Sequence, residues 1–336
     1  MKSVVVSGGF GLDRLAVVDV EAPVAGRGQV VLRMLAASVN YRDLLMVTGR
    51  YNPRQPLPLV PLSDGVGEVV EVGEGVDESW LGRRVCPIFV QGWHSGEPTR
   101  DKLKTTLGGP LDGVLRVLMA VPVASVVEVP AHLTDVEAAS LPCAAVTAWS
   151  ALVEQGGVRA GDVVLVQGTG GVSMFALQFA RMHGARVIVT SSRDEKLERA
   201  VGLGAEAGIN YVKEPRWGRA AAKLAGGEGV DHVVEVGGAG TLAESLAAVR
   251  VGGHLSMIGV LSGTAERLDL IPILMRNVRV QGVLVGHREG FERMVRAIGA
   301  HGMRPVVDRV FGWTEVGEAL AYLGAGGHFG KVCVRF

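Results

Sequence analysis

The pattern of hydrophobic and polar positions changes near residue 135. Before it, short apolar runs such as "QVVLRMLAASVN" and "GVGEVVEVGEGV" are separated at short intervals by proline and glycine, which predicts strands and turns of an all-β packing. After it, apolar strands alternate with helical segments, from "DVVLVQG" through "RVIVTS" to "GGHLSMIGV". This alternation is typical of a parallel sheet covered by helices on both faces.

The length of 336 residues favours two domains. We predict an α/β protein with a β-rich domain over residues 1–134 and a doubly wound parallel-sheet domain over 135–284. The second part opens with a helix that begins at Thr134 or Asp135 and ends before Gly156. The tail, 285–336, carries a helix and a last strand, and we expect it to return to the first domain.

A glycine-rich loop follows the first strand of the parallel sheet. Gly168, Gly170 and Gly171 lie between "DVVLVQ" and a helix that starts near Val172. The free N–H groups and positive dipole end of such a helix favour a pyrophosphate, and glycine lets the backbone approach it closely. Ser173 takes the third fingerprint position, where Gly or Ala is usual. The pattern predicts a dinucleotide site on a Rossmann-type domain.

The end of the next strand indicates which dinucleotide binds. An NAD site usually carries Asp or Glu there to hold the ribose 2′-hydroxyl, but this chain has "TSSRDEK". A 2′-phosphate would find hydroxyl and cationic donors in Ser191, Ser192, Arg193 and Lys196, which favours NADP(H). In an alternative interpretation, Ser192 and Glu195 form a capping box and the basic residues lie on a solvated helix face.

Composition narrows the class of partner and the compartment. The formal net charge of zero argues against a nucleic acid or a membrane surface as partner. No apolar run is long enough for a membrane helix, and the first residues do not have the pattern of a signal peptide. The three widely spaced cysteines form neither a disulfide framework nor a metal pair, so we expect a cytoplasmic protein.

With the β-rich half preceding the glycine loop, the stretches "NYRDLLMVTGRY", "LPCAAVTAWSAL", "GTGGV" and "HFGK" give the chain a family resemblance. It resembles the medium-chain dehydrogenase/reductase superfamily over essentially its whole length, and most closely the zinc-independent quinone reductase branch. The resemblance implies a GroES-like catalytic domain joined to a Rossmann domain, with the active site in the cleft between them.

The zinc-dependent branch of that superfamily gives a test of this placement. Its ligand positions correspond here to Asn40 (with Asp43 as the following Asp), Ser63–Asp64, and Cys143 before Thr147. Two of the three zinc ligands are therefore replaced by an amide and a hydroxyl, whereas catalytic zinc uses three good protein ligands. We expect no metal. Cys143 is interpreted as a small apolar filler in preference to a functional thiol.

The resemblance also implies roles for individual residues. Tyr41 or Tyr51 could donate a hydrogen bond to an oxyanion on the acceptor. An alternative interpretation gives Tyr51 and Asp43 a structural role in a loop. The implied catalytic residues are Asn40, Tyr41, Asp43 and Tyr51. The implied cofactor contacts are Thr147, Gly168, Gly170, Gly171, Val172, Ser191, Ser192, Arg193, Lys196, Tyr211, Gly237, Ile258, Gly259, Val260, Leu284, Val285, Gly286, Phe329 and Lys331, together with Gly330.

We therefore predict an NADPH-dependent oxidoreductase that transfers hydride to a quinone or an α,β-unsaturated carbonyl compound. The alternatives are a zinc-free enoyl-thioester reductase, an alcohol or carbonyl dehydrogenase, and a weakly active NADPH-binding protein. A homodimer is predicted too. The resemblance implies that the last strand of the parallel sheet, here within 277–286, pairs with its twin across a two-fold axis. This β-branched segment would be an aggregation hazard as a free sheet edge, and the pairing removes that hazard. In an alternative interpretation, a helix or loop of the same chain covers the edge.

Overall fold

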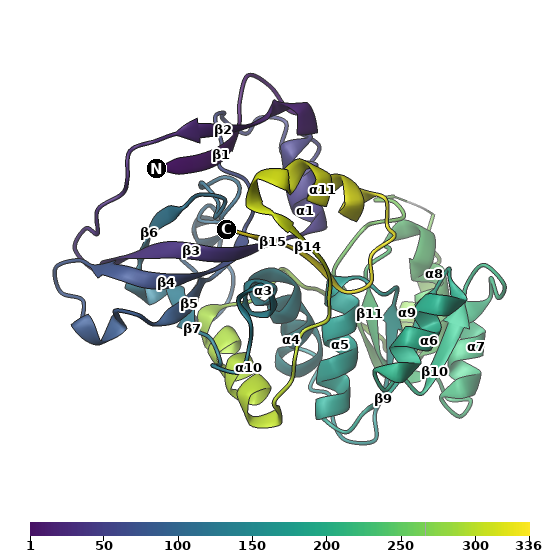
Figure 1. Cartoon of the computed structure of the whole chain (residues 1–336). Coiled ribbons are helices and arrows are strands. Elements are labelled where there is room, and N and C mark those ends of the chain that lie inside the picture. Colours follow the sequence, from purple (N-terminus) through teal and green to yellow (C-terminus); the bar gives the residue numbers. More distant parts are fainter. Residues whose placement is uncertain (266) are drawn as a thin grey trace. The chain divides into compact units, whose positions relative to one another are not determined.

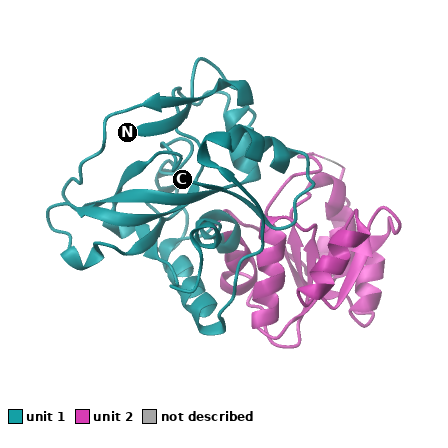
Figure 2. Ribbon diagram, viewed as in Figure 1, with its two compact units in different colours: residues 1–146, 286–336 teal, residues 147–285 magenta. Residues whose placement is uncertain are grey.

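The computed structural model describes residues 1–265 and 267–336, and these form two compact units (Figure 2). Unit 1 comprises Met1–Val146 and Gly286–Phe336, and unit 2 comprises Thr147–Val285. Both the amino and the carboxyl terminus of the chain belong to unit 1 (Figures 1 and 2). The predicted α/β class, with a β-rich part and a parallel-sheet part, is confirmed.

Unit 1 is built on a seven-stranded sheet in the order β14-β15-β3-β4-β5-β7, with β6 also paired to β3. Its strands are β3 (Gln29–Val39), β4 (Asp64–Val72), β5 (Arg84–Pro87), β6 (Leu118–Pro122), β7 (Val126–Glu128), β14 (Val307–Gly312) and β15 (Lys331–Arg335). A separate antiparallel pair is formed by β1 (Lys2–Val6) and β2 (Leu15–Asp19). The predicted return of the tail is confirmed, because β15 pairs antiparallel with β3, with Val332 opposite Val39.

The helices of unit 1 are α1 (Tyr41–Val47), α2 (Arg100–Leu103), α3 (Asp135–Ala139), α10 (Arg288–His301) and α11 (Val316–Gly324). The chain passes into unit 2 after Val146, whereas the sequence analysis places that boundary after residue 134. The difference arises because α3 packs against β3 and β4 and buries its apolar face, including Val136 and Ala138, within unit 1.

The predicted helix after Thr134 is present but irregular. The Thr134 hydroxyl accepts a bond from the Glu137 N–H at 3.4 Å, and the Glu137 carboxylate accepts one from the Thr134 N–H at 2.7 Å. Beyond α3 the helix widens into π turns at Leu141–Ala145 and Ser150–Glu154, on either side of α4 (Val146–Trp149). Pro142 lies in the first π turn, and because proline lacks an N–H it cannot continue the α-helical hydrogen bonds.

Unit 2 has a six-stranded, fully parallel sheet in the order β10-β9-β8-β11-β12-β13. The strands are β8 (Val163–Gln167), β9 (Arg186–Ser191), β10 (Ala207–Asn210), β11 (Val230–Glu235), β12 (Val249–Met257) and β13 (Arg279–Gly282). The helices are α5 (Gly171–Met182), α6 (Asp194–Gly202), α7 (Trp217–Leu224), α8 (Ala239–Ala248) and α9 (Ile271–Met275). The strand order reverses direction beside β8, and ligands of such sheets bind beyond the carboxyl ends of the strands at this switch point.

The edge strand β13 is shorter than the predicted segment 277–286. Asn277 has φ of 51° and Val285 has φ of 45°, and both values lie outside the extended region that a strand requires. Only residues 279–282 pair with β12, and all four are exposed. Within the residues that the structure describes, no helix has both the length and the apolar character to cross a membrane.

Candidate active site

The glycine loop of unit 2 has the predicted position between β8 and α5. Gly168 adopts φ of +67°, a conformation that favours glycine, and its N–H donates to the Thr190 carbonyl at 2.8 Å. Gly170 is the N-cap of α5 and offers no side chain to the first turn, so the N–H groups there remain available to a ligand. The Ser173 hydroxyl donates to the Gln167 carbonyl at 2.7 Å, which holds the helix close to the strand.

The end of β9 brings together most of the residues predicted to bind a 2′-phosphate. Ser191 is buried, whereas Ser192 and Arg193 are exposed, and the Tyr211 N–H donates to the Ser191 carbonyl at 3.1 Å. The helix α6 begins at Asp194 with Arg193 as its N-cap and without a side-chain cap bond. The alternative capping box of Ser192 with Glu195 is therefore not formed.

The nearest acid in this segment is bonded to other residues. The Asp194 carboxylate accepts a hydrogen bond from the Asn210 amide at 2.7 Å and forms an ion pair with Lys213. Asp194 thus follows the strand end and is held by β10 and the turn after it. Between Thr190 and this acid, the side chains are the hydroxyls of Ser191 and Ser192 and the guanidinium group of Arg193.

A buried carboxylate, which the sequence analysis missed, organises the neighbouring loops. Glu235, at the carboxyl end of β11, is fully buried, and its Oε1 accepts bonds from the N–H groups of Gly237 at 2.8 Å and Gly238 at 2.9 Å. Its Oε2 accepts one from the Gln167 amide at 2.7 Å. The hydroxyls of Thr241 and Ser245 complete its shell. The sequence signal was a polar residue one or two positions before glycine at the end of two apolar strands, in "DVVLVQG" and "DHVVEVG".

The Glu235 network also places the predicted contacts Gly237 and Ile258–Val260 side by side. The Ile258 N–H donates to the Glu235 carbonyl at 2.8 Å, and the Ser262 N–H donates to the Gly237 carbonyl at 2.7 Å. Leu284 and Val285 follow the carboxyl end of β13. Thr147, in α4, is buried within the same unit. Of the predicted cofactor contacts, Gly286, Phe329, Gly330 and Lys331 belong to unit 1.

Unit 1 contains a buried polar cluster, which we define as Asn40, Ser63, Asp64, Cys143 and Lys331. The Lys331 ammonium is 3% exposed and donates to the Asn40 side-chain oxygen at 2.5 Å and to the Val39 carbonyl at 3.1 Å. The Asp64 carboxylate accepts bonds from the Ser63 hydroxyl at 2.7 Å and the Cys143 N–H at 3.0 Å. Lys331 was predicted as a cofactor contact, and here its ammonium group is directed into this cluster.

Burial and nearby positive charges shift the pKa values of two carboxyl groups, one in the cluster and one beside it. Burial raises the pKa of Asp64, and the positive charge of Lys331 opposes that shift. Burial likewise raises the pKa of Asp43 to about 6, against the opposing charge of Arg42 and with a further increase from the Asp64 carboxylate. The Asp43 carboxylate accepts a bond from the Asn40 N–H at 2.8 Å, so it also fixes the start of α1.

The donor atoms at the three zinc-ligand positions do not fit a zinc ion. Asn40 and Ser63 offer an amide and a hydroxyl, which are weak ligands for zinc. Burial and the neighbouring Asp64 carboxylate raise the pKa of the Cys143 thiol well above its usual range, which disfavours a thiolate. The Lys331 ammonium is a fixed positive charge in the same cluster. In the described part of the chain, no group of three or more His, Cys, Asp or Glu side chains is arranged to hold a metal ion.

Two tyrosines of unit 1 present phenol groups to solvent. Tyr41 is 40% exposed and Tyr51 is 52% exposed, and the structure gives neither phenol oxygen a hydrogen bond to a described residue. The Arg42 guanidinium lies 5.2 Å from the centre of the Tyr51 ring and donates to the Leu107 and Gly109 carbonyls at 2.9 Å and 3.0 Å. Arg42 thereby fastens the loop 91–113, for which the sequence analysis gave no structure.

Comparison with known proteins gives the class of the chain. A family profile described as "Zinc-binding dehydrogenase" matches residues 171–300, and one described as "Alcohol dehydrogenase GroES-like domain" matches residues 26–131. Unit 1 thus carries a GroES-like domain, as predicted. The domains are those of an oxidoreductase of the zinc-type alcohol dehydrogenase-like kind. The chain belongs to the medium-chain dehydrogenase/reductase superfamily.

Individual relatives span nearly the whole chain. The zinc-type alcohol dehydrogenase-like protein C1773.06c of Schizosaccharomyces pombe is 43% identical, covering 97% of this chain and 96% of its own. The acryloyl-coenzyme A reductase of Metallosphaera sedula is 30% identical, covering 99% of each. A crystal structure of an NAD-dependent alcohol dehydrogenase has a TM-score of 0.92 and 32% identity, covering 100% of both chains.

Proposed function

We propose that this oxidoreductase transfers hydride from NADPH to a conjugated acceptor, an α,β-unsaturated carbonyl compound or a quinone, without a metal ion. The observation that carries the proposal is the Lys331–Asn40 hydrogen bond inside the polar cluster. The amide of Asn40 and the hydroxyl of Ser63 stand at two of the positions whose side chains would bind zinc, and the Lys331 ammonium group is bonded to that amide. NADPH supplies the hydride when bound, and the protein supplies orientation and hydrogen-bond donors.

Without a zinc ion, the preferred acceptor is one whose oxygen is only weakly basic after hydride addition. Hydride addition to an isolated carbonyl produces an alkoxide, which is strongly basic and which zinc stabilises directly. Addition to an enone or quinone produces an enolate or a hydroquinonate, whose oxygen is much less basic. Hydrogen-bond donors can then suffice, and the phenol groups of Tyr41 and Tyr51 are candidates.

Enoyl thioesters belong to the same acceptor class. An acryloyl-coenzyme A reductase is among the relatives, at 30% identity over 99% of the chain, which supports a double bond conjugated to a carbonyl as the reacting group. An alcohol or aldehyde substrate is the competing candidate, supported by the likeness to an NAD-dependent alcohol dehydrogenase.

The preference for NADPH rests on the end of β9. No carboxylate follows Thr190 until Asp194, and that group is paired with Lys213 and Asn210. Ser192 and Arg193 are exposed beside Tyr211 and can meet a 2′-phosphate. Cationic and hydroxyl donors at this position favour a phosphate over a hydroxyl.

Fluorescence titration tests this preference. We expect NADPH to bind at least about tenfold tighter than NADH, an advantage of ~1.4 kcal/mol. The double variant Arg193→Ala/Lys196→Ala should narrow the gap by weakening NADPH. Lys223→Ala, an exposed lysine on α7 in the same unit, controls for the loss of surface charge. Equal dissociation constants for the two dinucleotides contradict the proposal.

The acceptor is tested by NADPH oxidation with quinones, enones, enoyl thioesters and aldehydes at matched concentrations. We expect conjugated acceptors to react at least about a hundredfold faster than aldehydes, because Asn40 and Ser63 do not hold a zinc ion that would stabilise an alkoxide. Faster turnover of aldehydes, or of alcohols with NADP⁺, would favour the dehydrogenase candidate.

We also propose a homodimer that extends the sheet of unit 2 across β13. This strand is an exposed edge, and the apolar side chains of Leu274 and Met275 in α9 are 78% and 74% exposed. Such an edge favours pairing with a second copy. Light scattering at micromolar protein should give twice the mass of the chain. Val280→Lys should yield monomer, whereas Val251→Lys, at another exposed valine, should not.

A further inference from the structure

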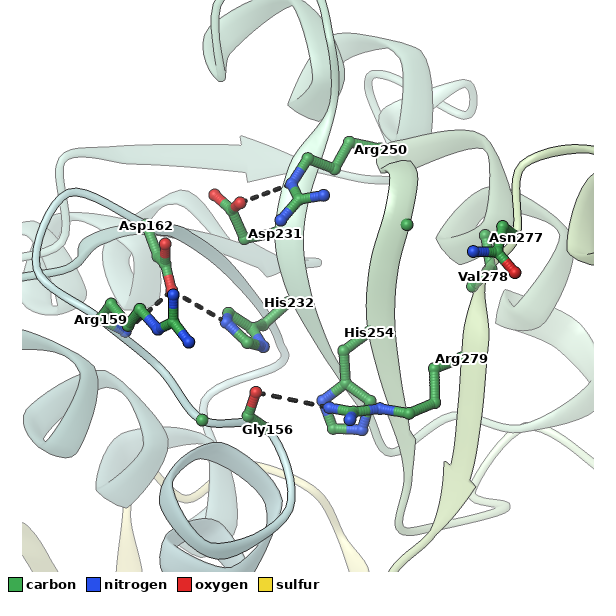
Figure 3. Close-up of a pocket in the computed structure, with 12 residues that line it drawn as sticks. Gly156, Arg159, Asp162, Asp231, His232, Arg250, His254, Asn277, Val278 and Arg279 are labelled. Atoms are coloured by element: carbon green, nitrogen blue, oxygen red, sulfur yellow. Dashed lines mark hydrogen bonds and ion pairs between the residues drawn. The ribbon is translucent and has the colours of Figure 1, made fainter.

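A second polar site lies at the amino ends of the strands of unit 2, whereas the glycine loop lies at their carboxyl ends. There the structure forms a cavity of about 450 Å³ (Figure 3). Asp162 precedes β8, His232 lies in the first half of β11, His254 lies in β12 and Arg279 begins β13. The predicted cofactor contacts of this unit do not line it, so the cavity is separate from the proposed dinucleotide site.

The two carboxylates of the cavity already have hydrogen-bond donors. Asp162 Oδ2 accepts from the Arg159 N–H at 2.8 Å and lies 3.1 Å from His232 Nε2. Asp231 accepts from Arg250 Nε at 2.6 Å and from the Val163 N–H at 2.7 Å. Neither acid is left as an open ligand for a cation.

Several nitrogens of the cavity, by contrast, have no partner. His254 is 4% exposed, and neither of its ring nitrogens has a hydrogen-bond partner among the described residues. The same holds for His232 Nδ1, and the two rings meet edge to face with centroids 5.8 Å apart. A buried polar group without a partner destabilises the folded protein, so a ligand that pairs with these nitrogens would be bound more tightly.

The charge of the cavity indicates the sign of that ligand. Three guanidinium groups, those of Arg159, Arg250 and Arg279, face two carboxylates that are already paired. Arg279 donates one nitrogen to the Gln155 carbonyl at 2.7 Å, and Figure 3 shows its guanidinium group beside the His254 ring. For Arg159 the structure gives no side-chain hydrogen bond to a described residue. The excess positive charge disfavours a metal cation and favours an anion.

We propose that this cavity binds a small oxyanion, a phosphate or carboxylate group, with Arg159, Arg279 and the His254 ring as donors. His232 donates its Nε2 proton to Asp162, so its Nδ1 is an acceptor for a protonated oxygen of the anion. Guanidinium and imidazole N–H groups match the oxygens of such an anion. Because the anion binds only the folded unit, it raises the stability of the protein with its concentration.

The histidine ring resonances report on the cavity directly. In protein labelled with ¹⁵N-histidine, inorganic phosphate or malonate is titrated against chloride at constant ionic strength, with His254→Asn to assign the His254 signals. We expect saturable shifts of the His232 and His254 rings, and a rise in Tm that continues with the logarithm of the anion concentration above the midpoint of these shifts. The comparison of phosphate with malonate decides which oxyanion the site prefers.

Two variants separate the cavity from general charge effects and from the glycine loop, which phosphate can also reach. Arg159→Gln should raise the midpoint of the ring shifts by about fivefold or more, because it removes a charged donor. Arg219→Gln, at an exposed arginine of α7, should leave it within about twofold.

Three results would overturn the proposal: absence of ring shifts with either anion, equal midpoints in the two variants, and ring shifts that follow protein concentration but not anion. The last would indicate that a second copy fills the cavity. NADPH affinity is measured in the same samples, so that failure of this site is distinguished from failure of the proposed function.

Discussion

Unit 2 builds its candidate dinucleotide site mainly from backbone, whereas unit 1 builds its polar cluster from side chains that are distant in sequence. Gly168 and Gly170 are contiguous with β8 and α5, and their function depends on N–H groups and conformation. Lys331 and Asn40 are 291 positions apart and meet only through the pairing of β15 with β3. A site of the first kind depends on glycine at fixed positions and on the backbone conformation, while a site of the second kind changes its chemistry when one side chain is replaced.

The largest effect is expected from removing the buried cation. Lys331→Met leaves Asp64 buried without the main charge that opposes its pKa shift, whereas Asp43 keeps the charge of Arg42. We expect the free energy of unfolding to fall by about 3–5 kcal/mol at pH 8. Urea unfolding measures this loss. The loss should shrink at pH 5, where the carboxyl groups take up protons.

Lys223→Met provides the matched control, because Lys223 is exposed on α7 and its replacement should change the stability by less than about 0.5 kcal/mol. If Lys331→Met is as stable as this control at pH 8, the Lys331 ammonium does not hold the cluster together.

Asp43 gives a pH-dependent test of the same unit. Its pKa is raised from 3.8 to about 6 in the folded protein, so between these values the folded state keeps a proton that the unfolded state has released. This contribution to stability is fully present below pH 3.8 and is lost as the pH rises through 6.

Asp43→Asn removes that titration while keeping a side-chain acceptor for the Asn40 N–H. Relative to the wild type, the variant should gain on the order of 3 kcal/mol in unfolding free energy between pH 4 and pH 7. Denaturant unfolding at a series of pH values measures the difference. A difference that stays constant over this range contradicts the raised pKa.

A smaller effect is expected in unit 2 from the carboxylate that supports the loops. Glu235→Gln replaces one acceptor oxygen by an NH2 group, which then faces other donors in either orientation of the amide. These donors are the Ser245 hydroxyl and the Gln167 amide on one side, and the N–H groups of Gly237 and Gly238 on the other. We expect a loss of about 2 kcal/mol in stability and weaker NADPH binding. Glu228→Gln, at an exposed position of the same unit, is the control. Unchanged NADPH affinity would show that the Glu235 network does not position the cofactor loops.

The sequence allowed much of unit 2 to be predicted, because its signals are local. The glycine loop, the end of β9 and the alternation of strands and helices each lie within a short stretch. The Glu235 network was missed because its donors come from β8, α8 and the loop after β11, which only the sheet order brings together. The extent of β13 was overestimated because the positive φ of Asn277 and Val285 has no clear sequence signal.

In unit 1, the replacement of zinc ligands at Asn40 and Ser63 was visible in the sequence, but the partner of Asn40 was not. Lys331 lies in "HFGK", and the resemblance to the family suggested a cofactor contact there. Its burial depends on β15 joining the sheet beside β3, a contact between the two ends of the chain. The cavity at the amino ends of the strands of unit 2 is likewise lined by residues from several strands, which no single sequence motif connects.

The central claim is that hydride transfer in this protein proceeds without a metal ion, and elemental analysis combined with a chelator tests it most directly. Protein purified without added metal is analysed for zinc, and NADPH oxidation with a conjugated acceptor is measured before and after incubation with chelator. We predict no stoichiometric zinc and an unchanged rate, because Asn40, Ser63 and Lys331 form a hydrogen-bonded cluster without three good zinc ligands. One zinc ion per chain, lost together with the activity and restored together with it, would contradict the account.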